Sequence, residues 1–530
     1  MSKPFFITTA IDYTNGAPHI GHAYEKVLAD VIARYHRLKG NEVFFLTGVD
    51  QHGQKVQQSA EKQGVEPQQF VDDITKKFLA LWQKLDISYD RWAATTDPLH
   101  KTCVQEILQR LFDEGQLYKA KQGGYYSVRQ EQFLTDKERN AEGEFGPEWG
   151  EVEFREEENY YFKLAEHKDW LLAFIDSHEN YITPAFRRSE LRNAVERLAG
   201  DLCVSRPKSR LKWGIEFPFD PEFVTYVWFD ALVNYISFAD YDPKSKTQNS
   251  KFAALWPALH VIGKDIMIPA HGVYWPIMLK ALGFTDEQIP PLLVHGWWNI
   301  AGEKMSKSTG NIVDPDALAD KYGNEALRYY LMSDIATGKD ADFSEERLVQ
   351  RYNTDLANSL GNLLNRTLNM AQRYRSGKLT PKLEVAGAPD FASTLAAYRA
   401  QFEGAASHVA GGSTTVSQTP AYSIHLALGE AMSSASLCNQ LIESVAPWKL
   451  AKDPAQADLL DAVLYTLAES LRIIAILISP VLPKAAQNIF TQLNWDKHFS
   501  LADATWGGLP DGHTVGSPTP LFPRIEESKA

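Results

Sequence analysis

Cysteine and long apolar runs are both scarce in this sequence. Its 530 residues include three cysteines, Cys103, Cys203 and Cys438, which lie far apart and form no C-x-x-C pair. This spacing argues against a disulfide framework and a cysteine-based zinc site, and it fits a reducing cytoplasm. No apolar run approaches the ~20 residues that a membrane span needs, so we expect no membrane association. The N-terminus has neither the apolar stretch nor the cleavage site of a signal peptide.

Basic residues are outnumbered by acidic ones. The chain has 54 Lys and Arg against 67 Asp and Glu, a formal net charge of -13. This balance argues against a protein that coats nucleic acid generally, because such proteins gain affinity by neutralising phosphates. It does not exclude an RNA ligand held by a local basic patch. With 44% hydrophobic residues, the chain can form several buried cores, and its length predicts two to four domains.

The first fifty residues have the pattern of a β-α-β unit. Residues 5–13, FFITTAIDY, form an apolar, Thr-rich run that is typical of a buried parallel strand. Residues 21–39 place apolar side chains on one helical face, and Gly40 follows where that helix should end. Residues 42–50 read as the second strand. Because such crossovers are right-handed, the unit predicts a doubly wound, Rossmann-like sheet.

The rest of the chain divides by composition. Residues 115–215 are rich in Gly, Glu and Arg and read as an insertion, and the sheet pattern returns at 224–235 and 259–262. Long amphipathic runs from about Phe343 indicate a helical bundle. The predicted fold class is therefore α/β, a doubly wound parallel catalytic sheet with an inserted connective domain and a C-terminal all-α bundle. The predicted units are the catalytic halves 1–114 and 216–300, the insertion 115–215, a loop and junction 301–342, the bundle 343–500 and a tail 501–530.

The segment His19-Ile20-Gly21-His22 follows the first strand and opens the first helix. A helix N-terminus offers unpaired N–H groups and a positive dipole end, which suit phosphate. Gly21 lets a ligand approach the backbone closely, and two histidines can donate to phosphate oxygens. Taken alone, this segment could equally be a structural turn with surface histidines.

The segment Lys304-Met305-Ser306-Lys307-Ser308-Thr309-Gly310-Asn311 follows the strand-like residues 291–300. Two lysines flanked by hydroxyl groups and glycines suit a mobile clamp for polyphosphate. Taken alone, an exposed basic loop is the simpler interpretation.

Together the two segments resemble the paired HIGH and KMSKS signatures of class I aminoacyl-tRNA synthetases, letter for letter and in the family's order. In that family the amino-acid carboxylate attacks the α-phosphate of ATP, and the protein positions the reactants and stabilises developing charge. The resemblance implies that His19 and His22 grip ATP in the transition state. It also implies that Lys304 and Lys307 hold the departing pyrophosphate, with Mg²⁺ bridging its oxygens.

The resemblance narrows to the methionyl-tRNA synthetases and covers nearly the whole chain. It implies a ligase that forms methionyl-adenylate and then transfers methionine to the 3′-terminal adenosine of tRNA(Met), using ATP and Mg²⁺. Asp50 would take the substrate ammonium. The implied methionine site comprises Ala10, Ile11, Tyr13, Asp50, Trp228, Ala231, Tyr235, His271 and Trp275.

The residue types in this site agree with a thioether substrate. A thioether is polarizable, unbranched and a poor hydrogen-bonder, and aromatic rings contact its sulfur favourably, by ~0.3–1.5 kcal/mol per contact. Tyr13, Trp228, Tyr235 and Trp275 supply such rings. Any one of them alone would more simply be a core residue.

The resemblance also assigns residues around ATP. Asp265 would accept from the ribose, and Arg206, counted with the catalytic residues, would lie near the reacting phosphates. The implied ATP-binding residues are Gly21, Glu25, Gly263, Asp265, Lys304, Ser306, Lys307 and Ser308.

Three residues of the helical region resemble the family's anticodon readers: Asn362, Arg366 and Trp448. Asn362 and Arg366 are four residues apart and so share one helix face. A tryptophan can stack on an unpaired base, while Asn and Arg can read its edge. The alternative for Trp448 is a packed residue after Pro447.

The chain departs from many relatives at the zinc knuckles of the insertion. Ser127, Gln130, Gly146 and Trp149 occupy the ligand positions, and they are no credible zinc ligand set. We therefore predict no zinc.

Two further departures concern register and length. One extra residue between Asp265 and His271 puts the register of residues 266–270 in doubt. No additional oligonucleotide-binding domain follows the bundle, which favours a monomer.

Two alternatives stay open at this point. The first is a class I synthetase for another amino acid, although the cysteine enzyme needs zinc and the branched-chain enzymes carry a large editing insertion. The second is a different class of protein, either a small nucleotidyltransferase with an H-x-G-H turn or a non-enzymatic paralogue. The anticodon-like residues argue against the nucleotidyltransferase, and the intact histidines and lysines argue against the paralogue.

Overall fold

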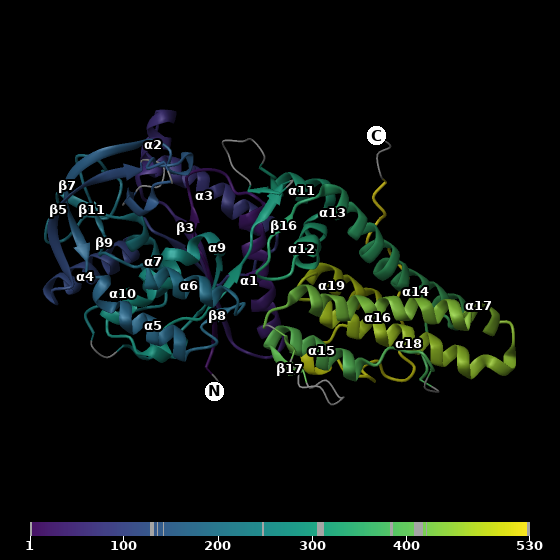
Figure 1. Ribbon diagram of the computed structural model, residues 1–530. Helices are drawn as coiled ribbons and strands as arrows, with labels where there is room; N and C mark the ends of the chain where they lie inside the picture. The colour runs from purple at the N-terminus through teal and green to yellow at the C-terminus, as the bar shows by residue number, and fades with distance from the viewer. Residues whose placement is uncertain are drawn as a thin grey trace.

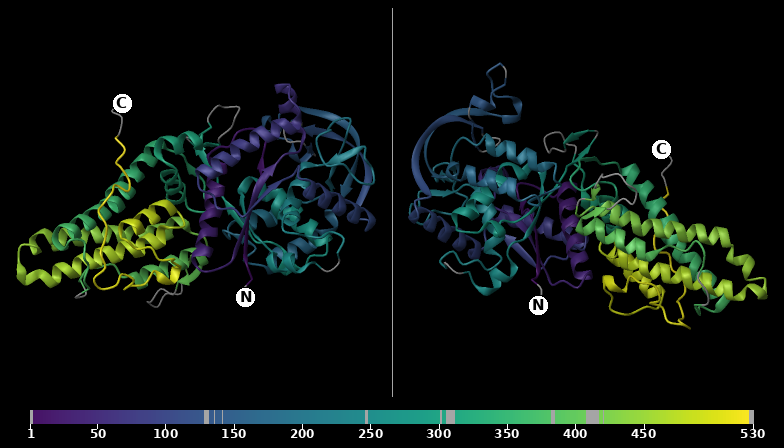
Figure 2. Two further views of the ribbon diagram at one scale, coloured as in Figure 1. Left: turned by 180° about the vertical axis from the view of Figure 1, so that it is seen from behind. Right: turned by 60° about the horizontal axis from the view of Figure 1, so that its bottom comes forward.

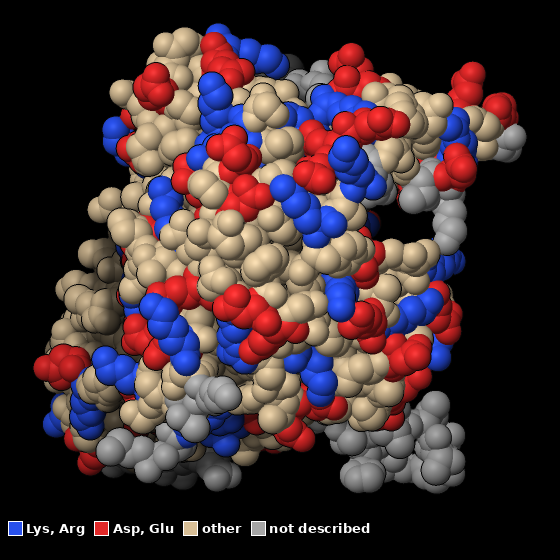
Figure 3. All heavy atoms as spheres, turned by 90° about the vertical axis from the view of Figure 1, so that its left-hand side faces the viewer, with Lys and Arg blue, Asp and Glu red and all other residues tan. Residues whose placement is uncertain are grey.

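The computed structural model describes residues 3–127, 132–134, 136–140, 142–245, 248–300, 302–304, 312–381, 385–407, 417–419 and 421–526. A mixed α/β half and an elongated helical half lie side by side (Figure 1). Among the described residues, no helix is both long and apolar enough to cross a membrane. On the outer end of the α/β half, acidic and basic side chains are interspersed (Figure 3).

The α/β half is built on a parallel sheet with strand order β2-β3-β1-β12-β13-β8, and β4 also pairs with β3. Every pairing in this sheet is parallel. The predicted doubly wound sheet is therefore confirmed. Its strands are β1 (Phe5–Thr9), β2 (Asp12–Tyr13), β3 (Val43–Asp50), β4 (Arg91–Ala94), β8 (Ile182–Thr183), β12 (Leu259–Gly263) and β13 (Leu292–His295).

The chain crosses from β1 to β3 through helix α1 (Ile20–Leu38), as predicted. Gly40 follows the helix with a φ of 91°, a backbone conformation that glycine adopts without strain. On its other side β1 pairs with β12, to which the chain returns only after the insertion. Connections therefore leave β1 and β12 in opposite directions. A crevice at the carboxyl ends of such a strand pair is the usual ligand site of an open α/β sheet.

Residues 224–235 correct one expectation, because they form no strand of the parallel sheet. Phe223–Thr225 form β11, which pairs with β10 (Ser205–Pro207) in a separate antiparallel ladder, and the chain then enters helix α7 (Val227–Ser237). The run is apolar on all sides because α7 is buried through most of its length. Periodicity alone cannot separate a short buried helix from a buried strand.

The insertion forms an antiparallel sheet of order β6-β5-β7-β9. Its long β5–β7 hairpin curves over the outer end of the molecule (Figure 2). The strands are β5 (Leu117–Ser127), β6 (Gln132–Leu134), β7 (Val152–Phe162) and β9 (Leu202–Cys203). The remaining helices of the α/β half are α2 (Gln54–Gln63), α3 (Pro67–Lys84), α4 (Pro98–Asp113), α5 (Lys168–Ser177), α6 (Arg187–Glu196), α8 (Ser250–Leu255), α9 (Lys264–Ile266) and α10 (Trp275–Ala281).

A small sheet joins the two halves, with β14 (Trp298–Ile300) between β15 (Glu303–Lys304) and β16 (Ala341–Asp342). The predicted helical region follows it, and its core is continuous with the α1 face of the parallel sheet. Its elements are α11 (Pro315–Tyr322), α12 (Asn324–Ser333), α13 (Glu345–Arg351), α14 (Asn362–Arg375), α15 (Phe391–Glu403), α16 (Ile424–Val445), α17 (Pro447–Leu450), α18 (Ala457–Ile478), α19 (Pro483–Gln492) and the short β17 (Ala405–Ser407) and β18 (Ser417–Thr419).

Candidate active site

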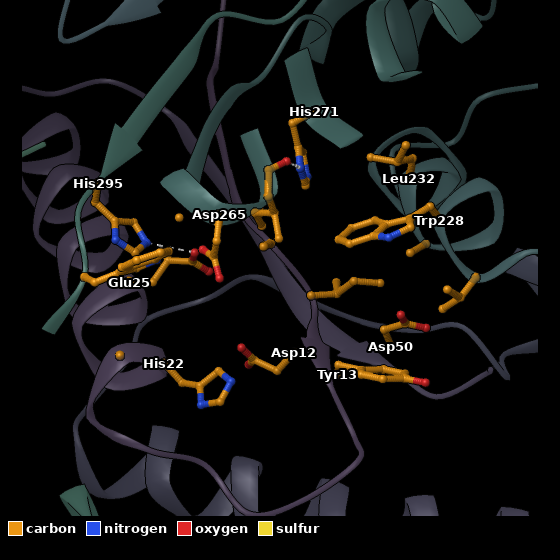
Figure 4. A pocket seen from close by; sticks show the side chains of 18 of the residues that line it. Asp12, Tyr13, His22, Glu25, Asp50, Trp228, Leu232, Asp265, His271 and His295 are labelled. Atoms are coloured by element: carbon orange, nitrogen blue, oxygen red, sulfur yellow. Dashed lines mark hydrogen bonds and ion pairs between the residues drawn. The ribbon is translucent and has the colours of Figure 1, made fainter. Parts of the chain in front are cut away.

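A cavity of about 470 Å³ opens at the carboxyl ends of the central strands. It lies between the first turn of α1, the start of α7 and the segment after β12 (Figure 4). Most of the residues predicted for ATP and methionine line it. They are Ala10, Ile11, Tyr13, His19, Gly21, His22, Glu25, Asp50, Trp228, Ala231, Tyr235, Gly263, Asp265 and His271.

The first turn of α1 fixes both histidines of the HIGH segment. His19 Nδ1 accepts a hydrogen bond from the Gly21 N–H at 3.1 Å, and His22 Nδ1 accepts one from the His19 N–H at 3.0 Å. Because both Nδ1 atoms are acceptors, each ring carries its proton on Nε2. The ring centroids are 3.8 Å apart. The cavity wall thus combines two ring N–H donors with the positive end of the α1 dipole, an arrangement that suits phosphate.

Tyr235 and His271 form a neutral hydrogen-bonded pair at the opposite end of the cavity. Burial lowers the pKa of His271 to about 4, so the ring is uncharged near neutral pH. Its Nδ1 lies 3.0 Å from the Ile266 carbonyl and is therefore the donor, which leaves Nε2 to accept from the Tyr235 hydroxyl at 2.7 Å. Both donors of the pair therefore have partners and are not available to a ligand. Its surface toward the cavity suits an apolar group better than a polar one.

The segment Met267–Tyr274, which follows Asp265, is kinked at Ile268, whose φ of −116° and ψ of 125° are not helical. It carries the His271 ring onto the Ile266 carbonyl and the Tyr235 hydroxyl. His271 therefore keeps the place in the cavity that the sequence predicted.

Trp275 lies behind the cavity wall and does not line the cavity. Its side chain is 1% exposed, and its ring centroid is 5.8 Å from that of Tyr235. The indole N–H donates to His260 Nε2 at 3.1 Å, and His260 Nδ1 in turn donates to the Thr8 hydroxyl at 2.6 Å. Trp275 therefore supports Tyr235 from behind. Sequence position alone could not separate the wall of the pocket from the layer behind it.

A buried carboxylate connects three elements around the amino-acid end of the cavity. Asp230, on α7, accepts from His52 Nδ1 at 2.6 Å and from His100 Nε2 at 2.7 Å. Burial alone would raise the pKa of Asp230, but the two imidazoles outweigh it and hold the pKa at about 2. Since His52 lies two residues after Asp50 and Asp230 two residues after Trp228, the network fixes both cavity residues relative to each other.

Glu25 and Asp265 lie near the HIGH turn (Figure 4). Glu25 bonds Lys26 Nζ at 3.0 Å and accepts from His295 Nε2 at 3.0 Å. Burial alone would raise the pKa of Glu25, but Lys26 and His295 outweigh it and lower the pKa. Glu25 is thus an anionic acceptor near neutral pH.

The predicted phosphate-side residues beyond the HIGH turn are placed only in part. Arg206 is 4% exposed, stacks over the Tyr226 ring at 4.5 Å and does not line the cavity. Lys304 belongs to β15, whose backbone pairs with Asn299. Ser306, Lys307 and Ser308 lie outside the described residues.

In the helical region, Asn362 and Arg366 line one groove between α14 and α16. Arg366 forms an ion pair with Glu443 of α16 at 2.7 Å. Trp448, at the start of α17, is 38% exposed and does not line that groove. The structure thus brings two of the three predicted anticodon residues together and leaves the third as an exposed ring.

The former zinc-ligand positions of the insertion are partly described. The Ser127 hydroxyl donates to the Trp149 carbonyl, so a direct hydrogen bond joins the end of β5 to the short 3₁₀ helix Pro147–Trp149. Gln130 lies outside the described residues. In the part of the chain that the structure describes, no group of three or more His, Cys, Asp or Glu side chains is arranged to hold a metal ion.

Several cavity residues had no individual role assigned from the sequence. They are Asp12, Lys55, Tyr226, Val227, Leu232, Ile266, His295, Gly296, Trp297 and Trp298. His295 could have been found, because it ends a buried parallel strand at the edge where ligands bind. Asp12 gives no such signal, because its orientation depends on a hydrogen bond from Lys26 of α1.

The geometry agrees with what the comparisons with known proteins show. Residues 5–144 and 149–368 match the family of class I tRNA synthetases (M), and residues 424–530 match the anticodon binding domain of methionyl tRNA ligase. Methionine–tRNA ligases of Deinococcus radiodurans and of a Nostoc species are each 40% identical over 99% of this chain. The chain covers 75% and 98% of their respective lengths.

Solved structures agree as well. The Mycobacterium tuberculosis methionyl-tRNA synthetase in complex with methionyl-adenylate superposes with a TM-score of 0.89, at 36% identity over 98% of this chain and 100% of that one. Its apo form gives a TM-score of 0.82, at 33% identity over 100% of this chain and 99% of that one.

A parallel sheet with the HIGH turn at its crevice and a helical region behind it defines a class I aminoacyl-tRNA synthetase. Within that class, the chain belongs to the methionyl-tRNA synthetase family. The predicted family, fold and enzyme class are therefore confirmed.

Proposed function

We propose that this cavity is where the chain performs its methionine–tRNA ligase reaction. The methionine carboxylate attacks the α-phosphate of ATP and pyrophosphate leaves. The 3′-terminal adenosine hydroxyl of tRNA(Met) then attacks the carbonyl carbon of the adenylate and AMP leaves. The observation that carries the proposal is the joining, in one cavity, of the two Nε2–H donors of His19 and His22 with the neutral aromatic pocket at Tyr235.

The HIGH end of the cavity takes the nucleotide. His19 and His22 donate to phosphate oxygens, where donors aimed at developing charge contribute most to the rate. Glu25, Gly263 and Asp265 surround the nucleoside, with Asp265 accepting from the ribose. The predicted pyrophosphate clamp comprises Lys304, Ser306, Lys307 and Ser308. Arg206, whose guanidinium lies over the Tyr226 ring, is proposed to act on the phosphates.

Mg²⁺ fits this end of the cavity, because it prefers oxygen ligands and usually binds through phosphates and one or two carboxylates. Of the carboxyl groups that line the cavity, those of Glu25 and Asp265 would hold the ion. When bound, the ion neutralises charge on the polyphosphate.

The other end takes methionine. Asp50 pairs with the ammonium, and Tyr13, Trp228, Ala231 and Tyr235 surround the thioether. Ala10, Ile11 and His271 complete the pocket, and Trp275 acts by holding Tyr235. The neutral Tyr235–His271 pair, whose donors already have partners, favours sulfur over the hydroxyl or amide of a polar side chain.

The helical region binds the anticodon of tRNA(Met) through Asn362, Arg366 and Trp448.

We propose to divide the chain into the units 1–114, 115–215, 216–300, 301–342 (the KMSKS loop and stem-contact junction), 343–500 and 501–530. We also propose a monomer, a cytoplasmic location and no zinc. Metal analysis showing stoichiometric zinc would contradict the last of these.

His22→Ala, which removes the imidazole donor, tests the assignment of the two ends. We expect methionine-dependent ATP–pyrophosphate exchange to fall by about 10²–10³-fold in kcat, the usual effect of removing one charge-stabilising donor. Methionine binding, followed by tryptophan fluorescence, should not change. Loss of methionine binding in this variant would contradict the assignment.

A further inference from the structure

Asp12 and Lys26 form a buried hydrogen-bonded pair in the cavity wall, and the reaction outlined above uses neither residue. Lys26 Nζ lies 2.8 Å from Asp12 Oδ1, 2.9 Å from the Ala10 carbonyl and 3.0 Å from Glu25 Oε1. Its side chain is fully buried. Three acceptors use the three hydrogens of the ammonium group, so Lys26 holds Asp12 in one orientation and has no donor left for a ligand.

The second oxygen of Asp12 faces the cavity. Asp12 is 4% exposed and lines the cavity, and its Oδ2 has no hydrogen-bond partner within the described residues. Figure 4 shows the carboxyl group turned toward the end of the cavity where His22 and Glu25 lie, away from Asp50. A buried polar atom without a partner is costly, so this oxygen is a candidate contact for a bound substrate.

The charges around Asp12 decide which form of the carboxyl can meet a nucleotide. Burial raises the pKa of Asp12 to about 7; Glu25 adds to this, while Lys26 opposes it. The titratable and charged groups of the surrounding elements are Glu25, Lys26, His19 and His22 of α1, Asp50 of β3, Lys55 of α2, Asp265 of α9, and His271 and His295. A carboxylate would repel phosphate, whereas a neutral carboxylic acid can donate to it.

We propose that Asp12 is a further nucleotide-binding residue, whose neutral carboxyl donates an Oδ2–H hydrogen bond to a phosphate oxygen of ATP and of the adenylate, with Lys26 as its positioning residue. This inference rests on the proposed assignment of the HIGH end to the nucleotide. The ribose is the less suitable partner, because Asp265 is already assigned to it.

Asp12→Asn separates the acid from the anion, because the amide keeps a donor and the shape but cannot titrate. The quantity to follow is the ratio of the wild-type kcat/KM for ATP to that of Asp12→Asn. We expect this ratio to fall by tenfold or more as pH rises from 6 to 8.5. The titration of ATP itself cancels in the ratio. KM for ATP in Asp12→Ala should be about tenfold above that of Asp12→Asn across the whole pH range. Asp72→Asn, an exposed control on α3, should follow the wild type.

Lys26→Met gives a second, independent readout. Removing the cation raises the pKa of Asp12 further, so the fall in kcat/KM should move to higher pH, and Lys26→Arg should restore the wild-type profile. If the pH at which kcat/KM for ATP falls is lower in Lys26→Met than in the wild type, or is unchanged, the proposed role of Lys26 is contradicted.

Two outcomes would overturn the inference while leaving the ligase intact. An Asp12→Asn variant as defective as Asp12→Ala would show that the anion is the active form. A rise in KM for methionine alone would place the carboxyl on the ammonium. Absence of methionine-dependent exchange in the wild type would instead refute the proposed function itself.

Discussion

Asp30 and Arg328 form an ion pair at 2.7 Å in which both side chains are fully buried. Asp30 lies on α1, the helix that presents the HIGH histidines, and Arg328 lies on α12. The same guanidinium donates to the carbonyls of Leu85, Pro480 and Val481. One arginine therefore joins the active-site helix, the end of α3 and the turn between α18 and α19. It fixes the helical region against the sheet.

Arg328→Met should destabilise the protein strongly. It leaves the Asp30 carboxylate short of a partner and three buried carbonyls without a donor, a loss of about 3–5 kcal/mol by comparison with other broken buried pairs. Urea unfolding followed by tryptophan fluorescence measures the change. The matched control is Arg192→Met, whose ion pairs with Asp176 and Glu196 are exposed and should matter little. Equal effects in both variants would contradict the structural role of Arg328.

Tyr235→Phe should weaken methionine binding. The variant removes the donor to His271 Nε2 and leaves a buried acceptor unsatisfied, which costs about 1–3 kcal/mol. KM for methionine in ATP–pyrophosphate exchange should rise by about tenfold, with little change in KM for ATP. Tyr181→Phe is the control, because that hydroxyl is buried without a partner among the described residues. An unchanged KM for methionine in Tyr235→Phe would remove Tyr235 from the pocket.

Asp230 should make the protein more stable at neutral than at acid pH. Its folded pKa of about 2 lies below the usual value of about 4, so the native state favours the ionised form. The contribution, roughly 2–3 kcal/mol, is present above pH 4 and is lost as pH falls toward 2. In Asp230→Asn this part of the acid dependence should disappear from the free energy of unfolding. An identical pH profile in the variant would contradict the assigned His52–Asp230–His100 network.

Trp448→Ala should separate the two half-reactions. Stacking of one base on an aromatic ring is worth about 1–3 kcal/mol, so kcat/KM for tRNA should fall by roughly tenfold or more. Methionine-dependent exchange should be spared, because it needs no anticodon contact. Trp506 is similarly exposed and packs beside Phe391 and Tyr465, so Trp506→Ala is the control. Equal loss in both assays would make Trp448 a structural residue.

The sequence predicted those parts of the site that local signals determine. The HIGH turn could be placed because a strand, a short loop and a helix N-terminus follow one another within residues 5–38. The cavity partners of that turn could not be placed so well, because they come from distant segments. His295 meets Glu25 across 270 positions.

Two other differences have a similar origin. Trp275 shares the aromatic character of the pocket but packs in the layer behind it, and layers are set by tertiary packing. The segment after Asp265 is kinked at Ile268, and a kink of this kind gives no periodic signal in the sequence.

The most direct test is ATP–pyrophosphate exchange with each amino acid in turn, followed by charging of tRNA(Met) with the preferred one. Methionine should support exchange without tRNA, far above isoleucine, valine, leucine and cysteine, and should then be transferred to tRNA(Met). A preference for isoleucine or cysteine, or no exchange with any amino acid, would contradict the account.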